Sequence, residues 1–145
     1  MNSKSEKKNK TLRGYVQNTN FGPYSLPVSF QNKLLKQYCE EKNKKFALPQ
    51  GEIVFSKNYI QLKSIIKKIK NKEGLVMMSI FMLPHSKLDR TIIFKNLVKK
   101  KIECHFLIEN IIAKTKNDYT EINNIFKFSN FQKNSTKIFN SIKKL

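Results

Sequence analysis

Two carboxylates in apolar surroundings are the residues of this sequence that most clearly suggest chemistry. Glu52 precedes three apolar residues, and Glu109 lies between the apolar runs 106–108 and 111–112. A carboxylate in an apolar setting either finds a partner or takes a raised pKa, which is the property of a general acid or base. Glu52 and Glu109 are therefore our candidate catalytic acid/base pair. The alternative is that each is a solvated strand-end acid or neutralises an arginine.

The two arginines are the second candidate group, because the other 27 of the 29 basic residues are lysines. A guanidinium offers a planar, bidentate fork that lysine cannot reproduce. Arg90, in the first turns of a predicted helix, is expected to bind an anion there or to pair with Glu109. Arg13 opens the first predicted strand, and the sequence does not decide whether it reaches the same site. Two structural salt bridges are the alternative.

Four residues complete the candidate ligand-binding set: Gln17, Gln31, Ser79 and Pro84. Gln31 falls on the apolar face of a predicted helix, where a buried amide must be hydrogen-bonded, either to the loop 18–26 or to a ligand. Gln17 and Ser79 are hydrogen-bonding groups after and within predicted strands. Pro84 ends the most apolar strand and shapes the loop that follows it.

The sequence lacks the familiar motifs for metals, covalent catalysis and nucleotide cofactors. His105 and Glu109 share one face of a predicted strand, but no second histidine stands at a matching spacing, so we expect no metal site. Ser79 lies in no G-x-S-x-G elbow. Neither G-x-G-x-x-G nor the P-loop pattern occurs, so we expect no cofactor.

The formal net charge of +19 has two interpretations. It can mark a polyanionic partner such as nucleic acid. However, the lysines are spread along the chain and accompany abundant asparagine and isoleucine, as A/T-rich codon usage produces. We therefore favour a solvated lysine surface over a nucleic-acid partner.

The compartment can be inferred from the cysteines and the apolar runs. Cys39 and Cys104 form no C-x-x-C motif, which is typical of a reducing compartment. The polar N-terminus has no apolar signal segment. The longest apolar run, 75–83, is far shorter than the roughly 20 residues that span a bilayer. We predict a cytoplasmic protein without a membrane span.

Apolar periodicity predicts one α/β domain over residues 11–130, preceded by a disordered tail (1–10) and followed by a polar extension (131–145) that is a loose helix or disordered. Strands are expected near 12–17, 46–55, 75–83 and 102–108, and helices near 28–43, 59–69, 86–101 and 118–128. This alternation predicts a four-stranded, mainly parallel sheet in three α-β-α layers. The expected order is 2-1-3-4, doubly wound, with ligands at the carboxyl ends of the strands.

Several segments resemble the sporadic carbohydrate cluster family, which consists of small bacterial proteins encoded among genes for surface-polysaccharide or O-antigen synthesis. The resemblance covers about residues 12–130 and is carried by these segments: Arg13–Val16, Pro27-Val28, Gln31-Asn32, Tyr38-Cys39, Leu75–Pro84 and Cys104–Asn110. It implies a role in bacterial surface-carbohydrate synthesis and does not imply a particular reaction.

A second resemblance concerns the fold alone. A strand containing Tyr15 followed by a helix carrying Gln31 is similar to the catalytic domain of serine recombinases, the resolvases. Three departures argue against recombinase chemistry. Gln17–Thr19 stands where a serine is expected after the first strand, the arginine cluster after the third strand is reduced to Arg90, and no DNA-binding domain follows within the 145 residues.

Three functional hypotheses follow. The first is an enzyme or binding protein of surface-carbohydrate synthesis, with a sugar, sugar-phosphate or nucleotide-sugar ligand at the carboxyl end of the sheet. The second is a nucleic-acid-binding domain of recombinase-like fold. The third is a non-catalytic subunit of a glycan-synthesis complex. The sequence leaves open whether the protein is an enzyme and whether it forms a homo-oligomer.

Overall fold

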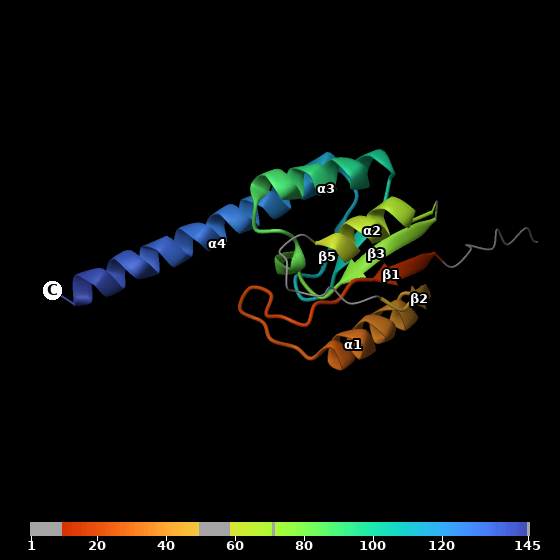
Figure 1. Cartoon of the computed structure of the whole chain (residues 1–145), viewed down its shortest axis with the longest axis horizontal. Coiled ribbons are helices and arrows are strands. Elements are labelled where there is room, and N and C mark those ends of the chain that lie inside the picture. Colours follow the sequence, from red (N-terminus) through yellow and green to blue (C-terminus); the bar gives the residue numbers. More distant parts are fainter. Residues whose placement is uncertain (1–9, 50–58, 71, 145) are drawn as a thin grey trace, which may run out of the picture.

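The computed structural model describes residues 10–49, 59–70 and 72–144. These residues form a mixed α/β fold (Figure 1). Its elements, in chain order, are β1 Thr11–Gly14, α1 Val28–Glu41, β2 Lys45–Ala47, α2 Ile60–Lys68, β3 Glu73–Met77, the 3₁₀ turn η1 Ile80–Met82, α3 Lys87–Lys99, β4 Cys104–Phe106, β5 Ile111–Ala113 and α4 Lys116–Lys143.

The strand order is β2-β1-β3-β4-β5, with parallel pairing from β2 through β4 and antiparallel pairing between β4 and β5. The predicted order of the first four strands is confirmed. The prediction of four strands is wrong, because β5 adds a fifth and makes the sheet mixed. An antiparallel neighbour needs only a tight turn, here at Asn110 with a φ of 54°. A three-residue strand is too short to give a periodic signal.

The central strand is shorter than its apolar run. The run 75–83 predicts one strand, but β3 ends at Met77 and the chain then turns into η1. Ser79 caps this turn by accepting a hydrogen bond from the amide of Phe81 at 3.2 Å. Ser79 therefore follows the strand instead of lying within it, and the apolar residues after Met78 pack beneath the turn.

Helices cover both faces of the sheet. In Figure 1, α1 lies on one side, and α2 and α3 lie on the other, with the first half of α4 beside α3. Leu35 and Cys39 of α1 are buried on the first side, and Leu62, Ile93 and Leu97 are buried on the second. The core is thus divided into two apolar layers by the sheet, whose central strand β3 is apolar on both faces from Leu75 to Met77, as in doubly wound folds.

The start of α4 is fixed by a capping box. The Thr115 hydroxyl accepts a hydrogen bond from the amide of Asp118, and the Asp118 carboxylate accepts one from the amide of Thr115. The helix then runs without a break to Lys143, through the predicted domain boundary near residue 130. Figure 1 shows its second half projecting away from the sheet.

Gly74 permits the close approach of β3 to its neighbours. A Cβ at this position would lie 2.6 Å from Leu12 Cδ2 and 2.9 Å from the carbonyl oxygen of Glu103. A backbone oxygen cannot move aside as a side chain can, so we expect Gly74→Ala to lower the free energy of unfolding by about 1–3 kcal/mol. Urea denaturation measures this change.

Gly14→Ala is the matched control in the neighbouring strand. Its added Cβ would meet the outer edge of the Phe46 ring at 2.8 Å, and a half-buried ring can rotate away. The loss of stability should therefore be smaller than in Gly74→Ala. Equal urea midpoints for the two variants would contradict the backbone-contact argument.

Candidate functional site

Two buried glutamines tie the first helix to the loop after β1. The Gln31 amide donates to the carbonyl oxygens of Gln17 at 2.7 Å and Leu26 at 2.8 Å, and Gln31 Oε1 accepts from the amide of Gln17 at 3.3 Å. These bonds match the loop-holding interpretation of Gln31. Its amide has no exposed surface with which to meet a ligand.

The Gln17 side chain closes the position between the ends of β1 and β3, where the sequence predicts a ligand crevice. Gln17 Nε2 donates to the carbonyl oxygen of Met82 at 2.8 Å and to Tyr15 Oη at 2.9 Å. It therefore joins the loop after β1 to η1. Both hydrogens of Gln17 Nε2 are thus used within the chain, so a ligand could accept from this nitrogen only by breaking that link.

Ser79 and Glu109 meet at the same edge of the sheet. The Ser79 hydroxyl donates to Glu109 Oε1 at 2.5 Å, and the amide of Ile80 donates to Glu109 Oε2 at 3.1 Å. Both carboxylate oxygens thus hold η1. Glu109 is half-buried, so the predicted catalytic carboxylate keeps some contact with solvent while serving as an anchor.

Arg90 is buried among neutral acceptors and is not paired with Glu109, so that proposed ion pair is wrong. Its guanidinium donates to Asn123 Oδ1 at 2.9 Å and to the carbonyl oxygens of Pro84 at 3.0 Å and His85 at 2.6 Å. It also lies 3.9 Å from the centre of the Phe126 ring. Burial lowers the pKa of Arg90. Arg90 thus contacts Pro84, which precedes α3. Through Asn123 and Phe126 it also joins α3 to α4.

Arg13 does not join this group in the structure. Arg13 makes a bidentate salt bridge with Glu73, with Nε–Oε2 and Nη2–Oε1 distances of 2.9 and 3.2 Å. Glu73 is the first residue of β3, so Arg13 reaches towards the amino edge of the sheet, away from the predicted crevice. Glu52 lies outside the described residues.

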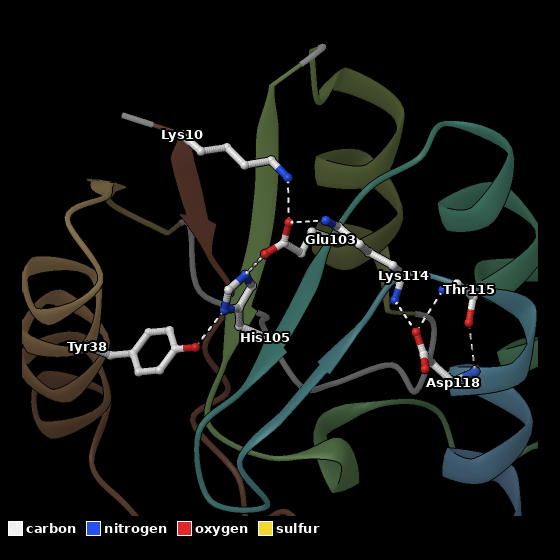
Figure 2. A network of polar contacts seen from close by, with 7 residues as sticks. All are labelled: Lys10, Tyr38, Glu103, His105, Lys114, Thr115 and Asp118. Carbon is white, nitrogen blue, oxygen red and sulfur yellow. Dashed lines mark hydrogen bonds and ion pairs between the residues drawn. The ribbon is translucent and has the colours of Figure 1, made fainter. Parts of the chain in front are cut away.

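A second polar network, at the amino edge, was missed from the sequence. Figure 2 shows Tyr38 of α1, His105 of β4 and Glu103 in a line. Tyr38 Oη lies 2.6 Å from His105 Nδ1, and His105 Nε2 lies 2.7 Å from Glu103 Oε1. An ionised carboxylate can only accept, so Nε2 carries the proton and Nδ1 accepts from the Tyr38 hydroxyl. The imidazole is then neutral and fully hydrogen-bonded.

Glu103 receives two lysines in addition to His105. Lys10 Nζ lies 2.6 Å and Lys114 Nζ 3.1 Å from Glu103 Oε2 (Figure 2). Burial alone would raise the pKa of Glu103, but the hydrogen bonds from Lys10 and Lys114 outweigh it and lower the pKa to about 2. The carboxylate is therefore ionised at every pH at which the protein is expected to fold.

The signal for this network was present in the run 102–106, where Glu103 and His105 alternate with apolar residues. Side chains two residues apart share one face of a strand, so the two were neighbours by spacing. From the sequence, His105 was instead compared with Glu109 as a possible pair of metal ligands, and a metal site was not expected. In the described part of the chain, no cluster of three or more His, Cys, Asp or Glu side chains is placed to hold a metal ion.

Burial lowers the pKa of His105, against the opposing effect of Glu103. Below about pH 6.5 the imidazole of His105 is therefore protonated in the unfolded chain, whereas in the folded chain it stays neutral to a lower pH. Stability from this group is complete above pH 6.5 and declines as the pH falls, with a slope of up to about 1.4 kcal/mol per pH unit. We expect the stability advantage of the native protein over His105→Gln to shrink between pH 7 and pH 5.

Urea denaturation across this pH range measures the difference, with Gln132→Ala as the control because this exposed position carries no titratable group. The curve for Gln132→Ala should run parallel to that of the unmodified protein. Parallel curves for His105→Gln as well would show that His105 does not bind its proton as the contacts indicate.

The second half of α4 carries two contrasting faces. Tyr119, Ile122 and Phe126 are buried against the domain, but helical spacing places lysines on the continuation of this face: Lys133, Lys137 and Lys144. The opposite face is polar near Asn117 and Asn124. Beyond residue 127 it carries five large apolar side chains that are 58–67% exposed: Phe128, Phe131, Ile138, Phe139 and Ile142. The apolar face of α4 therefore changes sides where the helix leaves the domain.

No helix in the described ranges is both long and apolar enough to cross a membrane. No model of a known protein family matches the chain, and no curated protein matches it significantly. Among solved structures, the chain is similar to the N-terminal catalytic domain of TP901-1 integrase. That alignment has a TM-score of 0.63 and 18% sequence identity, and it covers 88% of this chain and 99% of the other. The two chains therefore share a fold.

Proposed function

We propose that this protein is a self-associating nucleic-acid-binding module built on a serine-recombinase-like fold. The observation that carries the proposal is the two-faced distal half of α4. Its apolar face supplies a surface for a second helix, and its lysine face supplies contacts for phosphates. The similarity to an integrase catalytic domain is compatible with a nucleic-acid ligand.

Pairing through the apolar face is favoured by where the charges stand. Phe128, Phe131, Ile138 and Ile142 lie at the three- and four-residue spacing of a helix–helix seam, with Ser135 at the one intervening seam position. The flanking positions from Phe131 onward are Gln132, Asn134, Phe139 and Ser141, which are uncharged, and Lys127 flanks only the first seam residue, Phe128. Two copies can therefore meet along most of the seam without bringing lysines into contact, and pairing removes exposed apolar surface from water.

Lys133, Lys137 and Lys144 then point away from the seam, whereas Lys143 lies over the Phe139 ring, 4.9 Å from its centre. From residue 127 to residue 144 the chain has five lysines and no acid. A paired structure would display lysines on both outer sides, separated from the acids of the sheet domain. Such a segregated positive field attracts a polyanion more strongly than the mixed charges of α1, where Glu40 and Glu41 accompany the lysines.

Strand-transfer chemistry is not part of this proposal. No serine follows β1, and the residues that suggested a reactive edge are used internally. Gln17 and Gln31 hold the loop, Glu109 holds η1, and Arg90 binds backbone carbonyls. The carbohydrate hypothesis stays a prediction that rests on the sequence resemblance, because no structural feature described above favours a sugar over another ligand.

The salt dependence of DNA binding tests the lysine face. Fluorescence anisotropy with a short duplex should show affinity falling steeply with salt, with a slope of about −0.9 per phosphate contacted. We expect Lys133→Gln/Lys137→Gln/Lys144→Gln to weaken binding and to reduce the magnitude of this slope by up to about 2.7.

The charge-matched control is the α1 triple variant Lys33→Gln/Lys36→Gln/Lys42→Gln, whose lysines are also exposed. Its slope should match that of the unmodified protein. Equal losses in the two triple variants would mean that only total charge matters, and an absence of binding at about 0.15 M salt would reject the proposal.

Self-association is tested separately by sedimentation equilibrium. Phe131→Ser/Ile138→Ser should shift the protein to monomer, because it removes two apolar residues from the centre of the seam. Leu88→Ser, at a position in α3 that is 78% exposed, is the control and should leave association unchanged. A monomeric unmodified protein at about 100 μM would contradict the pairing.

A further inference from the structure

The proposed function gives no role to a groove that lies between α3 and α4. It has a volume of about 360 Å³, within the range of small-molecule sites. Its lining residues come from both helices: Thr91, Phe94, Lys95, Val98, Lys99, Lys116, Tyr119, Thr120 and Asn123. It lies on the part of α4 that packs against the domain, so the groove does not depend on the projecting half of the helix.

The floor of the groove is apolar and rigid. The rings of Phe94 and Tyr119 stack with their centres 4.5 Å apart and an interplanar angle of 24°. Both side chains are almost fully buried, and half-buried Val98 extends the same surface. The stacked pair therefore supports the floor from beneath and keeps it from collapsing, while the apolar surface open to a ligand belongs mainly to Val98 and to the exposed edges of the groove.

The rim carries one sign of charge. Lys95 and Lys99, one turn apart on α3, face Lys116 at the start of α4, and all three are exposed. No lining residue is acidic. None of the ion pairs found among the described residues involves these three lysines. Their charges are therefore uncompensated, beside a surface that water solvates poorly.

We propose that this groove binds a small amphipathic anion. An aromatic or branched alkyl body would lie on Val98 and Thr120, above the buried Phe94–Tyr119 pair, and a carboxylate, sulfonate or phosphate group would meet Lys95, Lys99 and Lys116. The apolar floor supplies most of the affinity, and the lysines select an anion over a neutral compound of the same shape.

Charge also separates this occupant from the alternatives. The projecting half of α4 from a second copy carries five lysines and no acid, so it would bring like charge to the lysine rim. A nucleic-acid duplex meets lysines through its phosphates but is too wide to place an apolar group on the floor. A compact anion with an apolar body satisfies both the floor and the rim.

Two dyes of nearly the same shape test the proposal. They are 8-anilinonaphthalene-1-sulfonate, which is an anion, and N-phenyl-1-naphthylamine, which is its neutral counterpart. Fluorescence titration of the full chain should show one saturable site for the anionic dye. Lys95→Gln/Lys99→Gln should raise its Kd at least fivefold and leave the Kd of the neutral dye within a factor of two.

Two further variants locate the binding. Thr120→Trp adds a large side chain at an exposed lining position and should abolish saturable binding of both dyes. Phe131→Ser/Ile138→Ser alters the distal seam and should leave the anionic dye bound with unchanged Kd. Binding that is lost in the seam variant but survives in Thr120→Trp would overturn the proposal.

The remaining outcomes are also decisive. An unchanged Kd in Lys95→Gln/Lys99→Gln, with Lys33→Gln/Lys36→Gln as the charge-matched control, would remove the lysines from the site. The absence of saturable binding in the unmodified protein would show that the groove does not take this class of ligand. The DNA experiments above use other variants, so either proposal can fail without the other.

Discussion

The burial of one carboxylate constrains which segments can meet at the amino edge of the sheet. Glu103 is only 8% exposed, and an ionised group at that depth is tolerated only with close partners of opposite charge. Those partners are Lys10 before β1, Lys114 after β5, and His105. His105 in turn is hydrogen-bonded to Tyr38 of α1. The carbonyl oxygen of Glu103 also accepts a hydrogen bond from the amide of Leu75. One residue thus links the first strand, the central strand, the fifth strand and the first helix.

The carboxyl edge is organised differently. There the polar groups are mostly amides and carbonyls, and each satisfies a piece of backbone that leaves the sheet. These residues were correctly predicted from the sequence to be polar groups in apolar surroundings, where a missing hydrogen bond costs free energy. It could not decide their role, because a buried amide needs a hydrogen bond whether its partner is a ligand or the chain itself. Gln31 and Arg90 are examples in which the hydrogen bonds of a buried polar side chain are made to the chain itself.

The order of the four parallel strands was predictable because strand and helix patterns alternate and the most apolar run must be central. The fifth strand was not predictable, since a three-residue segment is too short to show an alternation of apolar and polar side chains. The end of β3 was also misplaced, because the apolar run continues through η1 into buried positions that are not strand. The Glu103–His105 pair could have been found from its two-residue spacing, but the contacts with Lys10 and Tyr38 could not, as they join residues 93 and 67 apart. The Thr115–Asp118 capping box was legible in the sequence, but the helix was placed to begin at Asp118.

The change of faces along α4 separates two kinds of constraint on the sequence. Phe126 is the last residue that the buried core uses, and every large apolar residue described after it is exposed. Substitutions at the buried positions up to Phe126 are limited by folding, whereas those along the projecting half alter mainly the exposed surface of the helix. If this half pairs as proposed, its partner could change without cost to the domain, because the surface that would meet the partner and the surface that holds the fold share no residue.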